Sequence, residues 1–230
     1  METAVTVEVA GETLTLLPER GIYWPARRSL MVADLHLGKA AAMRAQGVAI
    51  PGGTTRTTLA RLTRMLAQTG AESLIVLGDL LHARQGRARE TLAQVTAWRE
   101  RHSRLAIRLI RGNHDRRASD PPPAWDIECL DPPAALHPFA LAHDPADRLP
   151  GIYTLAGHLH PACRLSGSGG QSLRLPCFWF GAACGVLPAC GEFTGTARIQ
   201  PARGDRIYAI AGGEVMRVPA CVRRRMAPAP

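Results

Sequence analysis

The sequence predicts an α/β fold, because short apolar runs alternate with amphipathic helical segments along its first half. The apolar runs at residues 30–33, 73–77 and 105–110 are separated by segments with apolar residues at helical spacing. This is the pattern of successive strand–helix units in a layered α/β protein. From residue 120 on, proline pairs and short strand-like runs replace the helical pattern, which indicates a second sheet.

The N-terminal elements are assigned from alternation and from turn residues. Residues 5–9 and 14–16 flank Ala10-Gly11, so we expect them to form a β-hairpin, with a third strand at residues 21–24. Residues 30–33 are all apolar, as in a strand that is buried on both faces.

Three helices are expected in the first half of the chain. A short helix at residues 40–46 ends at Gly47, and a longer one at residues 54–69 ends at Gly70, since glycine commonly follows the last helical residue. A third helix at residues 90–102 has its apolar residues on one face.

The second half of the chain is predicted to contain strands and turns. Strands are expected at residues 125–130, 134–142, 151–156, 173–180, 183–187, 206–210 and 215–218. A Gly/Ser turn at residues 166–170 joins two strands, and Pro161 is expected to stop a strand from continuing. No linker separates two cores, so we expect a single domain at residues 1–222, followed by a disordered basic and proline-rich tail at residues 223–230.

Composition excludes a membrane-spanning protein and favours a cytoplasmic one. The chain has 230 residues, 46% of them hydrophobic, yet no stretch approaches the roughly 20 apolar residues of a membrane span. No signal peptide is evident at the N-terminus. None of the six cysteines forms a Cys-x-x-Cys pair, so we interpret them as small buried residues in a reducing compartment.

The charge of the chain admits two interpretations. The formal net charge of +9 favours a polyanionic partner such as nucleic acid. However, Lys39 is the only lysine, while arginine, alanine and proline abound, which is also typical of a protein encoded by a GC-rich genome. Charge alone leaves both interpretations open.

Polar residues that bind metals follow the predicted strands. The motifs are Asp34-x-His36, Gly78-Asp79, Gly112-Asn113-His114-Asp115, the single His143, and Gly157-His158-x-His160. In an extended segment, side chains two residues apart point the same way. Oxygen and nitrogen ligands without thiolate suit Mn²⁺, Fe or Zn²⁺.

The number of these residues fits two metal ions. One bridging carboxylate and three further ligands for each ion require seven side chains. The chain supplies Asp34, His36, Asp79, Asn113, His143, His158 and His160. His114 is then left for a role other than coordination.

These motifs resemble those of the calcineurin-like metallophosphoesterase superfamily, and they span residues 34–160. The resemblance implies a four-layer α/β/β/α sandwich with two packed mixed sheets. It also implies two divalent ions, most often Mn, with Fe or Zn as alternatives. By this resemblance, the first metal is held by Asp34, His36 and His160, and the second by Asn113, His143 and His158. Asp79 is the implied bridge between the two metals. His114 is the implied proton donor, and Asp115 is the implied residue that orients it.

Within the superfamily, the chain resembles the bacterial ligase-associated DNA damage response endonucleases. The resemblance rests on Asp34-Leu35-His36-Leu37-Gly38-Lys39, Gly78-Asp79-Leu80-Leu81-His82 and the segment at residues 187–195. It implies a manganese-dependent phosphodiesterase that incises single-stranded DNA, with a helicase and an ATP-dependent DNA ligase as partners in repair. Cys190 departs from the pattern, which has a bulky aromatic residue there.

Further residues receive weaker assignments. Five arginines in loops after the metal-binding motifs are candidates to line a groove that binds phosphates, although solvated loop arginines would look the same. They are Arg84, Arg87, Arg89, Arg116 and Arg117. His82 is a candidate to support a metal ligand from behind, whereas His102, at a helix end, and His137, before a proline, are read as structural.

Two other functions compete with the endonuclease. A small-molecule phosphohydrolase, such as a nucleotide or UDP-sugar pyrophosphatase, shares the Asp-Leu-His-Leu opening, but the lipid A pathway hydrolase carries arginine where this chain has His114. A metal-free scaffold would have lost metal ligands, and this chain has lost none.

Overall fold

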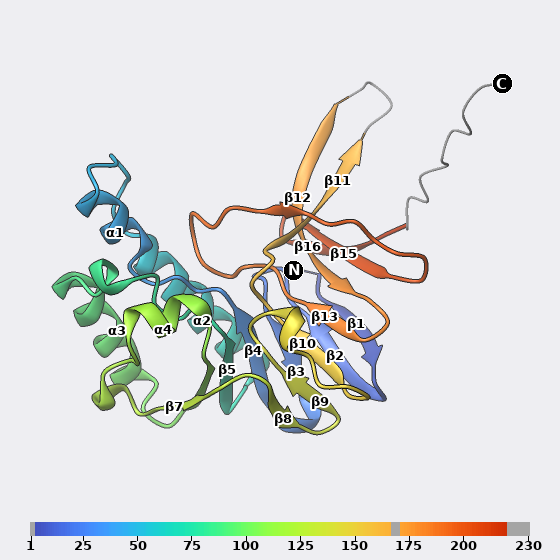
Figure 1. The fold of residues 1–230 in the computed structure, drawn as a ribbon, viewed down its shortest axis with the longest axis horizontal. Helices are drawn as coiled ribbons and strands as arrows, with labels where there is room; N and C mark the ends of the chain where they lie inside the picture. Colours follow the sequence, from blue (N-terminus) through green and yellow to red (C-terminus); the bar gives the residue numbers. More distant parts are fainter. Residues whose placement is uncertain (1–2, 167–170, 220–230) are drawn as a thin grey trace.

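Two mixed β-sheets pack face to face, and the α-helices lie along the outer side of the first sheet (Figure 1). The structure is a computed structural model that describes residues 3–166 and 171–219. It confirms the predicted α/β class and the two packed mixed sheets.

The first sheet has seven strands in the order of the sequence. They are β1 (Val5–Val9), β2 (Glu12–Leu16), β3 (Ile22–Trp24), β4 (Ser29–Ala33), β5 (Ser73–Leu77), β6 (Ala106–Ile110) and β7 (Ile127–Leu130). Strands β1 to β4 pair antiparallel, and β4 to β7 pair parallel. Every residue of β4 is buried, as the apolar run at residues 30–33 predicts.

Four α-helices occur in the described part of the chain: α1 (Lys39–Ala45), α2 (Thr54–Thr69), α3 (Arg89–Arg101) and α4 (Asn113–Ala118). The first three confirm the predicted helices to within a residue, while α4 was not predicted. Its six residues are too few to show a helical period. Leu59 and Leu62 of α2 and Trp98 of α3 join the apolar core between the helices and the first sheet.

The second sheet has nine strands in the described residues. They are β8 (Ala134–Leu136), β9 (Phe139–Leu141), β10 (Tyr153–Ala156), β11 (Pro161–Ser166), β12 (Ser172–Phe180), β13 (Cys184–Val186), β14 (Ala197–Arg198), β15 (Arg206–Ala211) and β16 (Glu214–Val218). Trp24, Met31 and Ile75 of the first sheet meet Phe139 and Phe178 of the second in a shared core. This core fixes the two sheets against each other.

Two strand predictions are wrong in detail. Pro161 begins β11 rather than stopping a strand, because the first residue of a strand need not donate to the ladder. The predicted strand at residues 134–142 is two antiparallel strands, β8 and β9, that meet at a turn at residues 137–138.

The helical cover of the molecule is one-sided. No α-helix in the described residues covers the outer face of the second sheet, where the resemblance implied a further helical layer. Most neighbours in this sheet pair antiparallel, and the parallel pair β9–β10 is connected through the short 3₁₀ helix η4 (Pro145–Asp147). Antiparallel neighbours can be joined by short turns, so most of this sheet requires no crossover helix.

Some predictions lie outside or at the edge of the described residues. The predicted tail at 223–230 lies outside them, as does most of the predicted turn at 166–170, and the single domain stays a prediction. Cys163, Cys177 and Cys190 are buried free thiols, and Cys129 and Cys184 are partly buried. Among the described helices, none has the length and apolar character that a membrane crossing requires.

Candidate metal centre

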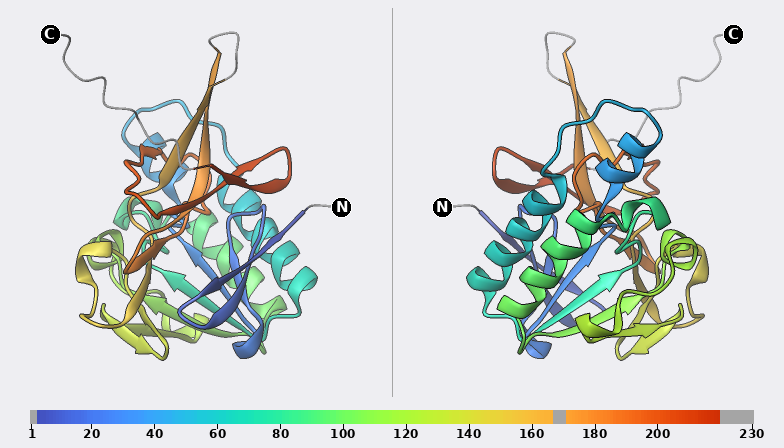
Figure 2. Two further views of the ribbon diagram at one scale, coloured as in Figure 1. Left: turned by 90° about the vertical axis from the view of Figure 1, so that its right-hand side faces the viewer. Right: turned by 90° about the vertical axis from the view of Figure 1, so that its left-hand side faces the viewer.

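The structure brings the seven residues that the sequence predicts as metal ligands into one cluster. Asp34 follows β4, Asp79 follows β5, Asn113 follows β6, His143 follows β9, and His158 with His160 follow β10. The cluster therefore lies where strand ends of both sheets meet. This is the end of the molecule from which α1 and the β11–β12 hairpin project (Figure 2).

Asp79 lies between two groups of side chains. Its Oδ2 is 3.7 Å from His36 Nε2, and its Oδ1 is 3.5 Å from His143 Nε2. The backbone N–H of His114 also donates to Oδ1, at 2.9 Å. Asp79 is only 2% exposed, so its two carboxylate oxygens face the two groups rather than solvent.

Asp34, His36 and His160 form the first group. His36 Nε2 and His160 Nε2 are 3.4 Å apart, and His160 Nε2 is 3.6 Å from Asp34 Oδ1. Asp34 is fully buried, and its Oδ1 accepts no hydrogen bond. A buried carboxylate oxygen without a donor is costly unless a cation satisfies it.

Asn113, His143 and His158 form the second group. His143 Nε2 is 2.9 Å from Asn113 Oδ1 and 3.0 Å from His158 Nδ1. His143 Nδ1 lies 3.2 Å from the carbonyl oxygen of Leu77, which can only accept. Nδ1 therefore carries the proton, and the lone pair of Nε2 points into the group.

The donors of both groups fit divalent metal ions. His160 repeats the arrangement of His143, because its Nδ1 donates to the carbonyl oxygen of Gly195 at 2.9 Å and leaves Nε2 free. Lone pairs of imidazole nitrogen and carboxylate oxygen then converge without protons between them. Three His/Asp groupings in the described residues are close enough to hold an ion, and such oxygen and nitrogen donors leave the identity of the metal open.

The backbone of these motifs is not extended, contrary to the expectation from the spacing of two. The φ angles are 54° at Asp34, 45° at His36, 54° at Asp79, 68° at His158 and 46° at His160. Non-glycine residues in this left-handed region are uncommon and cluster at functional sites. The sharp turns, rather than strand alternation, aim these side chains at one another.

Glycines in the motifs make room for the cluster. A Cβ on Gly78 would lie 2.0 Å from His143 Nδ1, and one on Gly157 would lie 2.8 Å from Asp34 Oδ2. Both separations are shorter than real contacts. These two positions therefore require glycine because the ligands approach the backbone closely.

Burial keeps His36 neutral. Burial, and then the neighbouring His160 and His114, lowers the pKa of His36 to about 2. Burial also raises the pKa of Asp79 above its ordinary value. A neutral imidazole is the form that binds metal, so His36 is ready to coordinate near neutral pH.

Asp115 does not orient His114, contrary to the prediction. Its Oδ2 accepts the backbone N–H groups of Asp79 at 2.7 Å and Gly112 at 2.9 Å, and its Oδ1 accepts that of Leu81 at 3.2 Å. As the third residue of α4, its side chain turns back to the start of the helix. Asp115 therefore fixes two ligand-bearing turns, and burial raises its pKa to about 6.

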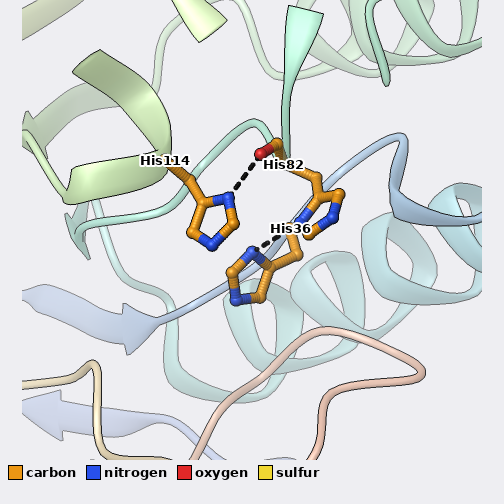
Figure 3. Close-up of side chains that lie close together, drawn as sticks. All are labelled: His36, His82 and His114. Carbon is orange, nitrogen blue, oxygen red and sulfur yellow. Dashed lines mark hydrogen bonds between the residues drawn. The ribbon is translucent and has the colours of Figure 1, made fainter. Parts of the chain in front are cut away.

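The carbonyl oxygen of His82 orients His114 instead. His114 Nδ1 lies 2.5 Å from that oxygen, and the rings of His114 and His82 stack with centroids 4.7 Å apart (Figure 3). His114 Nε2 is thereby directed to the cluster, 4.0 Å from Asp79 Oδ2. His82 Nδ1 is also 3.3 Å from His36 Nδ1, in keeping with its predicted support of a ligand.

Asp144 is a site residue that the sequence analysis missed. Its Oδ2 lies 3.6 Å from His158 Nε2, on the far side of that ring from His143. A carboxylate there favours a proton on Nε2 and frees Nδ1 toward the second group. Its position directly after His143 was the available signal.

The five predicted phosphate-binding arginines are placed outside the cluster. Arg87 donates to the carbonyl oxygens of Ala118, Ser119 and Asp120 and so closes the end of α4. The other four are exposed, and they lie on short helices rather than in loops: Arg84 in η2 (Arg84–Gly86), Arg89 in α3, Arg116 and Arg117 in α4.

Two histidines have structural surroundings, as predicted. His102 caps the end of α3 and its Nε2 is 3.2 Å from Thr63 Oγ1. Burial, followed by Arg101 and Arg99, lowers the pKa of His102, so it does not act as the expected cation there. His137 lies in the turn between β8 and β9.

Comparison with known proteins agrees with this geometry. The chain matches the calcineurin-like phosphoesterase family over residues 27–175. It resembles the crystal structure of a nuclease, MPE, from Pseudomonas putida, at 48% identity over 94% of this chain and 100% of that chain, with a TM-score of 0.82. A phosphoesterase from E. coli, YfcE, shows a weak likeness, at 16% identity over 80% of this chain and 88% of its own, with a TM-score of 0.38. No curated protein matches the chain.

The family match covers more than half of the chain, and the MPE structure is matched along its whole length. The family match includes the segments that carry Asp34, Asp79 and His143. The chain therefore belongs to the calcineurin-like phosphoesterase family, the metal-dependent hydrolases of phosphate esters.

Proposed function

We propose that the chain is a two-metal phosphodiesterase that acts as an endonuclease on single-stranded DNA in DNA repair. The observation that carries the proposal is the 48% identity to a nuclease over that nuclease's full length, together with the convergence of the seven predicted ligands. The net charge of +9 supports a polyanionic substrate.

The residues divide into two metal sites that share one carboxylate. Asp34, His36 and His160 would hold the first ion, and Asn113, His143 and His158 would hold the second. Asp79 would serve both sites, since its two oxygens face the two groups. Divalent ions at such a site activate water and stabilise charge on phosphoryl oxygens.

His114 supplies the proton that a departing sugar hydroxyl needs. Its Nδ1 donates to the His82 carbonyl oxygen, so the proton that it transfers is the one that Nε2 carries in the imidazolium form of the ring. The side chain is 28% exposed, so substrate can reach it. General acids of this kind contribute about 10²–10⁴-fold to the rate.

The resemblance noted above extends the proposal to metal, location and partners. Mn is the proposed native metal, with Fe and Zn as alternatives, and the proposed location is the cytoplasm. A helicase and an ATP-dependent DNA ligase of the same repair process are the proposed partners. Arg84, Arg89, Arg116 and Arg117 are exposed and stay candidates for contacts with DNA.

The test is hydrolysis by metal-stripped protein to which one metal is added at a time. Single-stranded, duplex and stem-loop DNA and a bis(nitrophenyl) phosphate ester serve as substrates. We expect Mn²⁺ to restore internal cleavage of single-stranded DNA and hydrolysis of the ester. Hydrolysis of the ester or of nucleotides with no cleavage of any DNA would instead identify a small-molecule phosphohydrolase.

A further inference from the structure

Three arginines gather on one face of the sheet end formed by β11, β12 and β14. Arg164 of β11 is directly opposite Arg174 of β12, and Ala162 of β11 pairs with Arg198 of β14. Residues in register share a face, and so do residues two apart in a strand. All three arginines are exposed.

The opposite face of these strands is apolar, and it is covered around Cys163 and Cys177. Cys163 and Cys177 point to that side and pack with Ile199, Ile207 and Ala209 in a small core. On the arginine face, Ala162 is buried, whereas the three arginine side chains are exposed and do not belong to the core.

Like charges directly opposite each other destabilise a sheet. Within the described residues none of the three arginines forms an ion pair, and the side chain of Arg174 reaches only a backbone carbonyl oxygen. The carboxylates on neighbouring loops are engaged elsewhere, because Glu192 binds Arg61 and Asp205 accepts from Trp179 Nε1 at 2.7 Å. A cost in stability without internal compensation points to an external anion.

The arginine face is continuous with the metal centre. β11 begins one residue after His160, and the N–H of Ala197 donates to the carbonyl oxygen of His160 at 2.9 Å. Arg174 is 3.5 Å from the carbonyl oxygen of Thr196, next to Gly195, whose own carbonyl oxygen holds His160 Nδ1. A chain of phosphates bound here would therefore reach the cluster.

The loop between the cluster and this face presents an aromatic ring. Phe193 is 54% exposed and has a φ of 54°, which is a strained conformation for a bulky residue. The loop is anchored directly before it: the N–H of Gly191 donates to the carbonyl oxygen of Asp34 at 3.1 Å, and Arg61 binds Glu192 and the carbonyl oxygen of Cys190. An exposed ring on an anchored loop next to an arginine face has the chemistry of a stacking platform.

We propose that Arg164, Arg174 and Arg198 bind the phosphates of a single-stranded nucleic acid, and that Phe193 stacks on one of its bases beside the metal centre. The inference rests on the proposed function, because it places the uncleaved strand next to the proposed nuclease site. Single-stranded nucleic acid is favoured over duplex because a stacking ring needs an unpaired base. It is favoured over a membrane because the arginines lie across three neighbouring strands, one of which, β11, begins directly after His160.

The test measures binding of a labelled oligothymidylate of about twelve nucleotides, by fluorescence anisotropy in chelator, with the whole chain. The arginine variant is R164A/R174A. The matched control is R101A/R104A, which removes the same charge from exposed arginines at the other end of the first sheet. The aromatic pair is F193A and F193Y.

We expect R164A/R174A to weaken binding by at least about tenfold at low salt. The slope of log affinity against log salt should fall in magnitude by about 1.4, since each of the two lost phosphate contacts on a single strand contributes about 0.7. The control should stay within about twofold of the wild type. F193A should weaken binding by about fivefold or more, while F193Y retains it.

An equal loss of binding affinity in R164A/R174A and in the control would rule out the proposed arginine surface. Equal binding by F193A and the wild type, or equal effects of F193A on single-stranded and duplex DNA, would overturn the stacking role. Thermal melts exclude misfolding, since removal of opposed like charges should not lower the melting temperature. Ester hydrolysis by the Mn²⁺-loaded wild type tests the proposed function, and no hydrolysis would count against it. The binding comparison is made without metal, so it tests only the proposed nucleic-acid surface.

Discussion

Asp79 is the residue that both halves of the cluster share. Its carboxylate oxygens lie 3.7 Å from His36 Nε2 and 3.5 Å from His143 Nε2, and they are almost fully buried. Its φ of 54° is a conformation that asparagine also tolerates. Asp79→Asn therefore removes the charge while it preserves the backbone.

We expect Asp79→Asn to abolish hydrolysis and to remove the stabilisation that Mn²⁺ gives the folded protein. Metal that binds only the native state raises the melting temperature, and a variant that cannot hold it should show no rise. Scanning calorimetry with and without Mn²⁺ measures this, next to an ester hydrolysis assay. Wild-type turnover in the variant would rule out the bridging role.

Replacement of His114 is expected to slow hydrolysis most for substrates whose leaving group requires a proton. A nitrophenolate leaves without a proton, whereas a sugar hydroxyl requires one, so His114→Ala should lower DNA cleavage by about 10²–10⁴-fold and ester hydrolysis far less. Steady-state rates on both substrates, with metal content checked in the same preparation, make the comparison. Equal losses on the two substrates would mean that His114 serves the architecture of the cluster and not proton transfer.

Asp115 is expected to act on stability, because its carboxylate accepts three backbone N–H groups and does not contact the imidazole of His114. Asp115→Ala leaves these buried donors without partners, each at a cost of about 1–3 kcal/mol. Urea unfolding of the metal-free protein should show a clear loss in the free energy of unfolding. Unchanged stability with impaired DNA cleavage alone would restore the orienting role that the sequence suggested.

At the scale of elements, hydrogen bonds between residues outside α4 hold the helix in place. Arg111, just before it, binds Asp120, just after it, through two hydrogen bonds of 2.8 and 2.7 Å. Arg87 adds hydrogen bonds to the last carbonyl oxygens of the helix. This clamp holds Asn113 and His114 against the cluster.

The ion pair between Arg111 and Asp120 predicts that the free energy of unfolding depends on pH. The hydrogen bond from Arg111 lowers the pKa of Asp120, against a small opposing effect of burial. A lowered carboxylate pKa in the folded state contributes stability above the unfolded pKa of about 3.9, and this contribution is lost as the pH falls through the folded pKa. Asp120→Asn should therefore destabilise by at most about 1 kcal/mol at neutral pH, since the pair is exposed.

The difference in the free energy of unfolding between Asp120→Asn and the wild type should shrink as the pH is lowered below about 4. Urea titrations at several pH values measure it. A difference that stays constant across this range would show that Asp120 acts through its shape and not through its charge.

The elements that sequence could predict are those with a strong local signal. β4 and β5 are runs of four apolar residues after a first serine, and α2 spans sixteen residues with a regular apolar face. α4 has six residues, so no period was visible, and with it the backward turn of the Asp115 side chain was missed. The left-handed turns at Asp34 and His158 were also missed, because tertiary contacts impose them against local preference.

At the scale of the whole molecule, the cluster joins the two sheets. Asp34 and Asp79 follow strands of the first sheet, while His143 and His158 follow strands of the second. The residue types and their order predicted, from sequence alone, the seven residues that the structure brings together. Asp144 was missed although it directly follows His143. The contribution of the Gly195 carbonyl oxygen could not be predicted, because it depends on how distant segments meet.

Anomalous X-ray diffraction from crystals of the protein grown with MnCl₂ measures the proposed centre most directly. We expect two anomalous peaks about 3.5–4 Å apart, one on the side of His36 and one on the side of His143, with Asp79 between them. No peak within the cluster, or a single peak that Asp79 does not contact, would contradict a two-metal centre at these seven residues.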